Sequence, residues 1–503
     1  MNGNLYALFA ERFSRCPGDP ALETGTGRRY SFSELEAHAA RYASLLADLG
    51  LVPGDRVAVQ VEKSPQALFL YLACLRAGLV YLPLNNAYQE GEVTYFLDNA
   101  EPRAVIAQPK SMPWLEPVAR VRGIAHVFSM DEEGGGTFTE AAASASEGFA
   151  VVERAPDDLA AILYTSGTTG RSKGAMISHR NLASNATTLH RYWGFREGDV
   201  LVHMLPLFHV HGLFVACHTA LLNTSLIRFH SRFDARRALA DFAVSSVFMG
   251  VPTFYTRLLA ESALNREACS NMRLFISGSA PLLAETFEEF RARTGHVILE
   301  RYGMTETGML TSNPLDGERR GGTVGLPLPG VQVRVADDAN RPLPPGEVGN
   351  VQVKGDNVLA GYWRMPEKDR EEFTGDRFFK TGDVGVFSAD GYLSIVGRSK
   401  DLIITGGFNV YPKEIELAID ELPGVLESAV IGVPHADFGE AVTAVVVPRK
   451  GAAAPSEGDI ITALRGKLAN FKVPKRVVFL EELPRNTMGK VQKNELRKRL
   501  GDP

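Results

Sequence analysis

The chain has 503 residues, a length that favours about two to four domains over a single one. Hydrophobic residues make up 45% of it and charged residues 22%, a balance typical of a folded globular protein, which excludes an intrinsically disordered chain. The formal charge of −5 at pH 7 excludes a global basic field, so we expect no nucleic acid partner, and any binding of phosphate must be local.

Cysteine usage and the length of the apolar runs predict a cytoplasmic protein without a membrane span. The four cysteines lie far apart and form no CxxC pair, which argues against a zinc site and against a disulfide framework. The longest apolar run, residues 67–75, ends at Arg76 and is shorter than the roughly 20 residues that cross a bilayer. The N-terminal segment has no positive residues ahead of its apolar positions, so it predicts an amphipathic helix and not a secretory signal.

The first half of the chain has the pattern of a parallel sheet. Residues 55–84 contain a β-rich run, a helical apolar run over 65–77 and a second β-rich run, which together predict a βαβ unit. Further strand patterns that end in Gly- or Pro-bearing turns lie at residues 104–107, 160–165, 246–251 and 274–278. We therefore expect an α/β fold with parallel or mixed sheets, and ligands at the carboxyl ends of the strands. Residues 131–148, rich in Gly, Ala and Ser, predict a surface connection.

The second half of the chain has a different texture. After residue 325, short β-like runs broken by Gly and Pro predict a small antiparallel sheet or barrel. Residues 401–503 combine helical patterns near 413–422 and 456–469 with two β-like runs, and predict a compact α+β domain. Within this domain, residues 471–499 hold nine Lys or Arg against three Asp or Glu, which indicates either a solvated terminal helix or a surface that meets a polyphosphate.

The segment YTSGTTGRSKG at residues 164–174 carries the clearest chemical information. It follows a predicted strand, and its hydroxyl side chains, three glycines and Lys173 describe a loop whose backbone N–H groups can surround a phosphate. The segment differs from the GxxxxGK[ST] nucleotide-binding pattern. A flexible linker is the alternative, which the preceding strand and the cations Arg171 and Lys173 disfavour. Lys173 is therefore a candidate for binding the β- and γ-phosphates of a nucleotide.

This segment resembles the phosphate-loop signature of the acyl-adenylate-forming superfamily, which includes acyl-CoA synthetases, nonribosomal adenylation domains and luciferases. Further segments match that superfamily in the same order: LPLFHVHG (205–212), SGSAPL (277–282), ERYGMTET (300–307), TGD (381–383), GRSKDLIITGGFNVYPKEIE (397–416) and PRNTMGK (484–490). The resemblance spans nearly the whole chain. It implies a ligase that activates a carboxylic acid with ATP and passes the acyl group to a thiol. It also implies an AMP-binding domain over residues 1–397 and a mobile C-terminal domain over 398–503, with a hinge near Lys400.

The resemblance assigns the nucleotide and coenzyme A sites to the matching segments. The residues implied to bind these two ligands are Thr165, Ser166, Gly167, Thr168, Thr169, Gly170, Lys173, Ser279, Ala280, Pro281, Glu300, Tyr302, Gly303, Met304, Thr305, Glu306, Asp383, Arg398, Lys400, Gly407 and Lys490. Glu306 is implied as the Mg²⁺ ligand, since this ion takes one or two carboxylates besides phosphate oxygens. Tyr302 would cover the adenine, and Asp383 would accept the ribose hydroxyls. Without the resemblance, Glu306 would be an ordinary surface acid and Tyr302 a core aromatic residue.

Two C-terminal features are implied to serve the two half-reactions. Lys490 lies in a loop rich in Pro, Asn and Gly, which we expect to project from the small domain. The matching lysine of the superfamily bridges the attacking carboxylate and the α-phosphate. Gly406 and Gly407 are implied to border the path of the coenzyme A thiol, where a backbone without side chains leaves room. The alternative for the glycines is a plain tight turn. The alternative for Lys490 is that it is simply one of the nine solvated basic residues of this stretch.

For the acid, the resemblance is greatest to ligases that join malonate, or methylmalonate, to coenzyme A. It implies His209 and Ser277 as pocket groups and Met304 beside C2 of the acid. Arg257 is implied as the partner of the distal carboxylate of a dicarboxylic acid, with a solvated helix arginine as the alternative. The implied catalytic groups are Lys490, Glu306, Thr165, Lys173 and His209. Three alternatives stay open: a coenzyme A ligase for another short-chain acid, an adenylation enzyme that loads a carrier protein, and a luciferase-like oxygenase.

Overall fold

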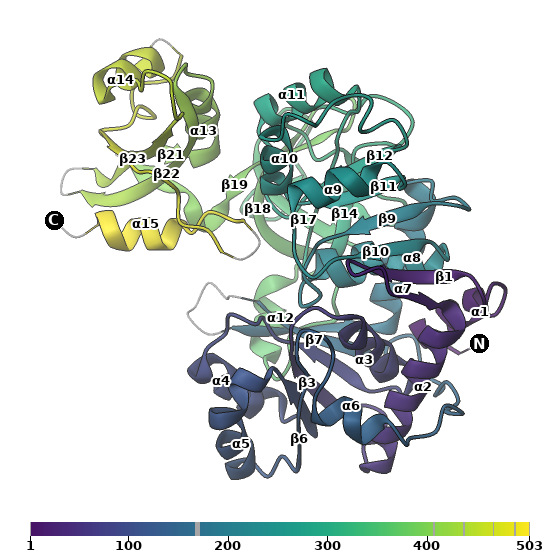
Figure 1. Cartoon of the computed structure of the whole chain (residues 1–503). Coiled ribbons are helices and arrows are strands. Elements are labelled where there is room, and N and C mark those ends of the chain that lie inside the picture. The colour runs from purple at the N-terminus through teal and green to yellow at the C-terminus, as the bar shows by residue number, and fades with distance from the viewer. Residues whose placement is uncertain are drawn as a thin grey trace. The chain divides into compact units, whose positions relative to one another are not determined.

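The computed structural model describes residues 2–165, 172–405, 408–435, 438–465, 467–486 and 489–501, and is drawn in chain order from purple to yellow in Figure 1. The chain divides into two compact units. The first comprises Met1–Gln332 and Lys354–Arg377, and the second comprises Val333–Val353 and Phe378–Pro503. In the described ranges the strands form four sheets, two of them in the first unit. Across these ranges no helix is both long and apolar enough to cross a membrane.

A six-stranded sheet with the order β6-β5-β3-β4-β7-β8 contains the predicted βαβ unit. Its strands are β3 (Arg56–Gln60), β4 (Val80–Pro83), β5 (Ala104–Ala107), β6 (His126–Ser129), β7 (Leu159–Thr165) and β8 (Lys173–Ser178). The first five pair in parallel, and β8 pairs with β7 in antiparallel fashion. The parallel strands are buried on both faces, which is why they read as continuous apolar runs in the sequence.

Helices cover this sheet. They are α3 (Pro65–Arg76), α4 (Glu90–Ala100), η1 (Pro109–Ser111), α5 (Met112–Val121) and α6 (Thr137–Ala142). The start of α3 is fixed because the Ser64 hydroxyl accepts a hydrogen bond from the Ala67 N–H at 3.2 Å. The connection predicted over residues 131–148 contains the short helix α6, which the sequence pattern did not predict. The buried ring of Phe138, 5.0 Å from that of Tyr42, supplies the packing that stabilises this short helix.

A nine-stranded sheet with the order β15-β14-β13-β12-β11-β9-β10-β1-β2 forms the rest of the first unit. Its strands are β1 (Pro20–Thr24), β2 (Arg29–Ser31), β9 (Val200–His203), β10 (Leu226–Phe229), β11 (Val247–Gly250), β12 (Leu274–Ser277), β13 (Leu299–Met304), β14 (Gly308–Ser312) and β15 (Leu326–Pro327). All neighbours from β1 to β13 are parallel, and the pairs at the two edges are antiparallel. The carboxyl ends of β11, β12 and β13 therefore meet at one edge of the sheet.

The remaining helices of the first unit are α1 (Leu5–Phe13), α2 (Phe32–Asp48), α7 (His179–Tyr192), the π-helix η2 (His211–Cys217), α8 (His218–Leu222), α9 (Ala235–Phe242), α10 (Pro252–Leu259), α11 (Ala284–Thr294) and α12 (Pro366–Glu372). The amphipathic helix predicted at the N-terminus is confirmed by α1, whose buried face includes Leu5, Tyr6, Phe9 and Phe13. Two aromatic side chains of α10 and α11, Tyr255 and Phe290, meet in the buried core beside β12.

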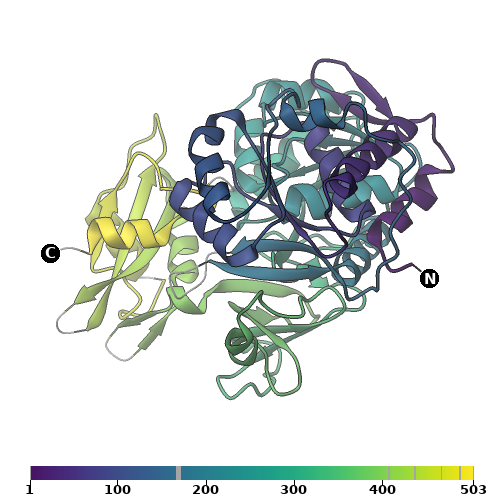
Figure 2. The ribbon, with the colours of Figure 1, turned by 90° about the horizontal axis from the view of Figure 1, so that it is seen from below.

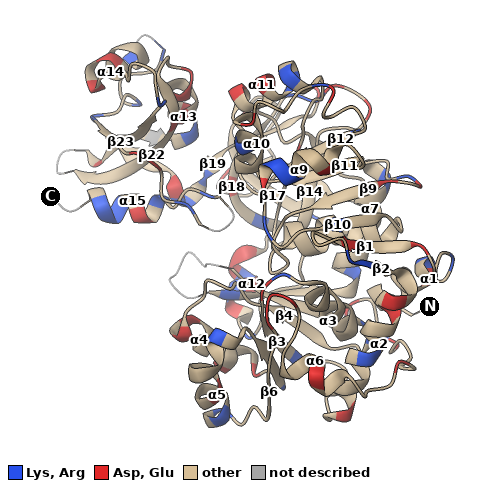
Figure 3. Cartoon of the chain, viewed as in Figure 1, with Lys and Arg blue, Asp and Glu red and all other residues tan. Residues whose placement is uncertain are grey.

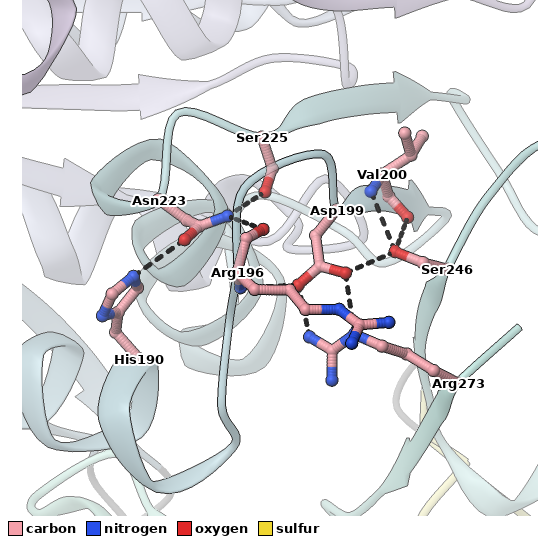
Figure 4. A network of polar contacts seen from close by, with 8 residues as sticks. All are labelled: His190, Arg196, Asp199, Val200, Asn223, Ser225, Ser246 and Arg273. Carbon is pink, nitrogen blue, oxygen red and sulfur yellow. Dashed lines mark hydrogen bonds and ion pairs between the residues drawn. The ribbon is translucent and has the colours of Figure 1, made fainter.

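A polar network around the buried Asp199 lies at the opposite, amino-terminal edge of the nine-stranded sheet (Figure 4). Asp199, just before β9, accepts hydrogen bonds from Ser246 Oγ at 2.8 Å and from Arg273 Nε at 2.7 Å. Ser246 and Arg273 directly precede β11 and β12. Burial alone would raise the pKa of Asp199, but the hydrogen bonds from Arg273, Arg196 and Ser246 outweigh it and lower that pKa. The polar groups of this network are therefore bonded to one another, and the carboxyl edge remains the expected place for ligands.

The second unit holds the two smaller sheets. The four-stranded sheet, in order, consists of β16 (Gln332–Ala336), β17 (Gly349–Lys354), β18 (Phe379–Phe387) and β19 (Leu393–Arg398). The five-stranded sheet contains β20 (Ile403–Thr405), β21 (Phe408–Val410), β22 (Val425–His435), β23 (Gly439–Pro448) and β24 (Arg476–Phe479). The helical elements are η3 (Ser399–Asp401), α13 (Pro412–Asp420), α14 (Glu457–Arg465) and α15 (Lys493–Leu500). In Figure 2 the helices α13, α14 and α15 gather with the five-stranded sheet, in light green to yellow.

The predicted fold class is confirmed by this architecture, including the antiparallel strands after residue 325 and the α+β arrangement over 401–503. Helix α15 occupies the end of the basic stretch 471–499 and appears as a mainly blue segment in Figure 3. Part of its charge is paired within the unit: Arg497 binds Asp401 at 2.8 Å. The division into residues 1–397 and 398–503, with a hinge near Lys400, stays a prediction.

Candidate active site

The β7–β8 hairpin holds the two ends of the predicted phosphate loop. Thr165 ends β7 and Lys173 begins β8, and the two residues lie directly opposite each other in the antiparallel register. Their side chains therefore extend from the same face of the hairpin. The other predicted loop residues, which are Ser166, Gly167, Thr168, Thr169 and Gly170, lie outside the described residues. The hairpin thus presents a hydroxyl at the end of β7 and a cation at the start of β8.

Glu306 lies between β13 and β14 and is brought to this hairpin as the sequence predicts. Its side chain is buried, with Oε1 accepting a hydrogen bond from Thr165 Oγ1 at 2.9 Å. Tyr362, which the sequence analysis did not single out, donates its hydroxyl to the same Oε1 at 3.4 Å. The backbone of Glu306 is fixed as well, because its C=O accepts from the Leu359 N–H at 2.8 Å. The segment after β17 therefore completes the surroundings of this carboxylate.

Lys173 lies on the other side of the Tyr362 ring. Its Nζ is 4.1 Å from the ring centroid and 2.7 Å from Glu372 Oε1, at the end of α12. The Lys173 side chain is 9% exposed, so both contacts are made with little competition from water. Burial, followed by the negative charges of Glu306 and Glu372, raises the pKa of Tyr362 far above its usual range. The phenol therefore stays protonated and acts as a hydrogen-bond donor.

The charges of this cluster decide which ligands fit. The ammonium of Lys173 is paired with Glu372, whereas Glu306 accepts only from hydroxyl groups, so the site can take a cation at Glu306 together with a phosphate chain at Lys173. Within the described ranges, no group of three or more His, Cys, Asp or Glu side chains is arranged to hold a metal ion. A lone buried carboxylate such as Glu306 fits Mg²⁺ that takes its other ligands from phosphate oxygens and water.

The segments 277–282 and 300–307 meet at the carboxyl edge of the nine-stranded sheet. Glu300 Oε1 accepts a hydrogen bond from the Leu282 N–H at 3.3 Å, which joins them. Ser279 has a φ of 74°, a left-handed conformation that shapes the turn leading to the predicted residues Ala280 and Pro281. Gly303 lies so close to β14 that a Cβ there would be 2.1 Å from the Gly308 carbonyl oxygen. The adjacent Tyr302, Met304 and Thr305 are half-buried at this edge.

Next to this edge, buried hydrogen-bonding groups lie without partners. Arg301 is 2% exposed, and its Nε and Nη2 have no hydrogen-bond partner in the part of the chain that the structure describes. The same holds there for Ser277 Oγ and His211 Nε2. A Cβ on Gly278 would lie 2.5 Å from Arg301 Cζ, so the guanidinium packs on the backbone beside Ser277. Unsatisfied buried donors of this kind call for an anionic ligand.

The electrostatics of Arg301 and His211 reflect their burial. Burial lowers the pKa of Arg301 to about 9. Burial, with help from the charge of Arg301, holds the pKa of His211 well below its usual range. His211 Nδ1 lies 3.2 Å from Ser279 Oγ, which orients the imidazole. The predicted residue His209 is half-buried at the start of this segment, and its Nδ1 accepts a hydrogen bond from the His211 N–H at 3.2 Å.

Arg257 and Arg301 differ sharply in their surroundings. Arg257 is exposed in the last turn of α10, whereas Arg301 is buried within β13. Arg301 is not among the predicted site residues, although it stands beside the motif residue Tyr302. The sequence nevertheless contains a sign of its role, because Arg301 follows the apolar run of the predicted strand VILERYG. A charged residue is rarely buried in a strand unless it has a partner.

The remaining predicted residues belong to the second unit. Asp383 on β18 and Arg398 on β19 lie opposite each other and form an ion pair of 2.6 Å, with Asp383 buried. Lys400 is exposed in the short turn η3. Gly406 and Gly407 lie outside the described residues. Lys490 is exposed in a loop between β24 and α15, where its N–H donates to Asn486 Oδ1 at 3.0 Å.

Comparisons with known proteins cover the whole chain. The family described as AMP-binding enzyme matches residues 9–363, and the AMP-binding enzyme C-terminal domain matches residues 414–490. The malonate–CoA ligase of Arabidopsis thaliana is 34% identical over 99% of this chain and 90% of its own length. The sulfoacetate–CoA ligase of Cupriavidus necator is 35% identical over 98% and 97%. The crystal structure of ATP-bound MatB from Rhodopseudomonas palustris is 55% identical, with a TM-score of 0.97, and covers 100% of this chain and 99% of its own.

Proposed function

We propose, since this chain belongs to the AMP-binding enzyme family, that it joins malonate to coenzyme A with ATP. In the first step a malonate oxygen attacks the α-phosphorus of ATP and pyrophosphate leaves, which gives malonyl-AMP. In the second step the thiolate of coenzyme A attacks the acyl carbon and AMP leaves. Activation is needed because a carboxylate is a poor electrophile until its oxygen becomes part of a good leaving group.

The single observation that carries the choice of acid is the buried set of Arg301, Ser277 and His211. A short monocarboxylic acid would leave these groups unpaired in a dry pocket, which costs free energy on binding. The second carboxylate of malonate would supply the missing anion and acceptors. We therefore propose Arg301 as the main partner of the distal carboxylate, and Arg257, which the sequence resemblance implies, as the competing candidate. Met304 would then lie beside C2 and limit its substituents, methylmalonate being the test case.

The hairpin cluster supports the nucleotide half of the proposal. Thr165 and Lys173 would bind the phosphate chain, since they offer a hydroxyl and an ammonium on the same face. Glu306 would hold Mg²⁺, which when bound would neutralise phosphate charge. Lys490 would approach the attacking carboxylate and the α-phosphate in the first step. A hinge near Lys400, and Gly407 as a residue bordering the path of the thiol, would serve the second step.

A second candidate substrate is sulfoacetate. Its sulfonate is an anion that a buried guanidinium and hydroxyl bind by the same hydrogen bonds. The identity to a sulfoacetate–CoA ligase over nearly the whole chain favours testing it. We also propose a cytoplasmic location, which the free state of all four cysteines supports.

The test is AMP release that depends on ATP and coenzyme A, measured with malonate, methylmalonate, sulfoacetate, succinate and propionate. We expect malonate to give the highest kcat/KM. In Arg301→Gln, the ratio of kcat/KM for malonate over propionate should fall by about 10²–10³, because the distal anion is buried without a partner. Arg257→Ala, made in parallel, shows which arginine has this role. Equal turnover of malonate and propionate by the unchanged protein would refute a dicarboxylate pocket.

A further inference from the structure

The lysine expected to bind phosphate is already paired with a carboxylate. Lys173 Nζ lies 2.7 Å from Glu372 Oε1, and the two side chains are 9% and 24% exposed. The ring of Tyr362 covers another side of the ammonium at 4.1 Å. An ammonium this deeply buried is costly unless an anion accompanies it, and Glu372 supplies that anion when no phosphate is present. A phosphate chain that binds Lys173 must therefore compete with Glu372.

The neighbouring carboxylate has a different partner. Glu371 is 61% exposed and binds Lys368 at 2.5 Å, one turn earlier on α12. Two adjacent glutamates of one helix thus have different partners, since the ion pair with Lys173 is made by Glu372. This arrangement separates a contact effect from a general effect of charge near the site.

We propose that Glu372 is a positioning residue that acts as the resident counter-ion of Lys173 and is exchanged for phosphate when ATP binds. This inference rests on the proposed function. It has two consequences for the reaction. The carboxylate weakens the binding of ATP, since part of the attraction of Lys173 is already used. It also reclaims the lysine after the first step, and so speeds the release of pyrophosphate.

The test is equilibrium binding, by titration calorimetry, of ATP and of inorganic pyrophosphate to the full chain without acid or coenzyme A. In Glu372→Gln, both ligands should bind about fivefold more tightly, the size of one partly exposed ion pair. Glu371→Gln is the matched control and should change either affinity less than about twofold. In a Lys173→Met background the Glu372→Gln substitution should have no further effect, because the two residues act through one contact.

Two outcomes would overturn the inference. Weaker ATP binding in Glu372→Gln, similar to that of Lys173→Met, would mean that Glu372 only orients the lysine. Equal effects of Glu372→Gln and Glu371→Gln would mean that the general charge of α12 matters and the contact does not. Failure of the unchanged protein to bind ATP is a separate result, since it would refute the proposed function itself.

Discussion

Tyr362 is the residue that joins the two charged parts of the candidate active site. Its hydroxyl donates to Glu306 at 3.4 Å, and its ring lies 4.1 Å from the ammonium of Lys173. The Tyr362 side chain therefore contacts a carboxylate through its hydroxyl and a cation through the face of its ring. Because the two contacts use different atoms, substitution can separate them.

Tyr362→Phe keeps the ring and removes the hydroxyl, whereas Tyr362→Leu removes both. We expect the KM for ATP to change less than about twofold in the Phe variant and to rise about three- to tenfold in the Leu variant, since a desolvated cation–π contact is lost. Initial rates with ATP varied at saturating malonate and coenzyme A provide the measurement. Equal effects of the two variants would mean that the hydroxyl, and not the ring, matters.

The sequence predicted the members of this cluster that lie within its motifs. Thr165, Lys173 and Glu306 were identified, and the structure brings them together around one tyrosine. Tyr362 and Glu372 were missed because they come from a segment almost 200 residues further along the chain than Lys173, as the separation of the Lys173–Glu372 contact shows. No spacing within a single motif encodes a contact of that kind.

At the level of elements, the backbone at the start of the π-helix η2 packs against another backbone segment and leaves no room for a side chain. A Cβ on Gly212 would lie 2.0 Å from the carbonyl oxygen of Pro206. Gly212 also accepts, through its own C=O, a hydrogen bond from His203 Nε2 at 2.9 Å. The backbone beside His211 is therefore held by a close approach that only glycine permits.

Gly212→Ala should lower the free energy of unfolding by about 1–3 kcal/mol, because the backbone must move to admit a methyl group. It should also raise the KM for malonate more than the KM for ATP, since His211 would shift with it. Gly375→Ala is the matched control, as a Cβ there meets nothing within 4 Å. Urea unfolding and steady-state kinetics on both variants test this. Wild-type stability in Gly212→Ala would contradict the tight packing.

Lys63 connects the ends of two sheets in the first unit. It follows β3, and its Nζ lies 2.6 Å from His203 Nδ1 and 3.0 Å from the His203 carbonyl oxygen, at the end of β9. The ring of Phe229 on β10 is 4.4 Å away. Burial lowers the pKa of Lys63 to about 7. In the unfolded chain the same group titrates near its ordinary value of about 10.4.

This difference predicts a dependence of stability on pH. Between about pH 7 and pH 10 the unfolded chain binds more protons at residue 63 than the folded chain does, so the free energy of unfolding rises with pH. The destabilising contribution of Lys63 is complete below about pH 7 and disappears as the pH approaches 10.4. The increase in the free energy of unfolding caused by Lys63→Met should therefore be smallest at high pH.

Urea unfolding at pH 7, 8 and 9 measures this effect. We expect the difference in the free energy of unfolding, Lys63→Met minus the unchanged protein, to fall steadily across the series. Lys498→Met, at an exposed position of α15, is the control and should give a difference that does not vary with pH. Parallel curves for the Lys63 variant would show that this amine keeps its ordinary pKa in the folded protein.

Most elements were predictable because their burial leaves a simple pattern. The strands β3, β4, β5, β7, β11 and β12 are short apolar runs before turn residues, and each was found. Helix α6 was missed because its sequence has few apolar residues, and its stability depends on the contact of Phe138 with Tyr42. The reversal of β8 against β7 was not predicted either, since a loop that can surround a phosphate can lead to a helix or to a strand.

At the level of the whole molecule, Lys490 tests the assignment of separate half-reactions to separate surfaces. Lys490→Ala should abolish malonate-dependent formation of the adenylate, while the conversion of supplied malonyl-AMP to malonyl-CoA stays largely intact. The reason is that the exposed lysine is expected to act only when its loop reaches the attacking carboxylate. Pyrophosphate release and thioester formation, assayed separately, measure the two steps.

Lys498→Ala removes the same charge from the same basic stretch and should leave both steps unchanged. It is an exposed residue of α15 with no place in the proposed site. Equal loss of both half-reactions in Lys490→Ala would mean instead that this lysine stabilises the small domain. Sequence patterns do not show which compact unit the strands β16 to β19 belong to. Short β-like runs of this kind have the same pattern in either unit.

The chain passes between its two units three times, after Gln332, after Val353 and after Arg377. Tyr362 and Glu372 thus reach the first unit on a stretch whose two ends continue into β17 and β18, which pair with each other. A genetic crossover at residue 333 that replaced everything downstream would import a foreign tyrosine and glutamate along with the foreign second unit. A crossover at residue 378 would keep both side chains but would divide the β17–β18 pair between two parents. A single crossover can therefore exchange the second unit intact only together with the residues that contact Lys173.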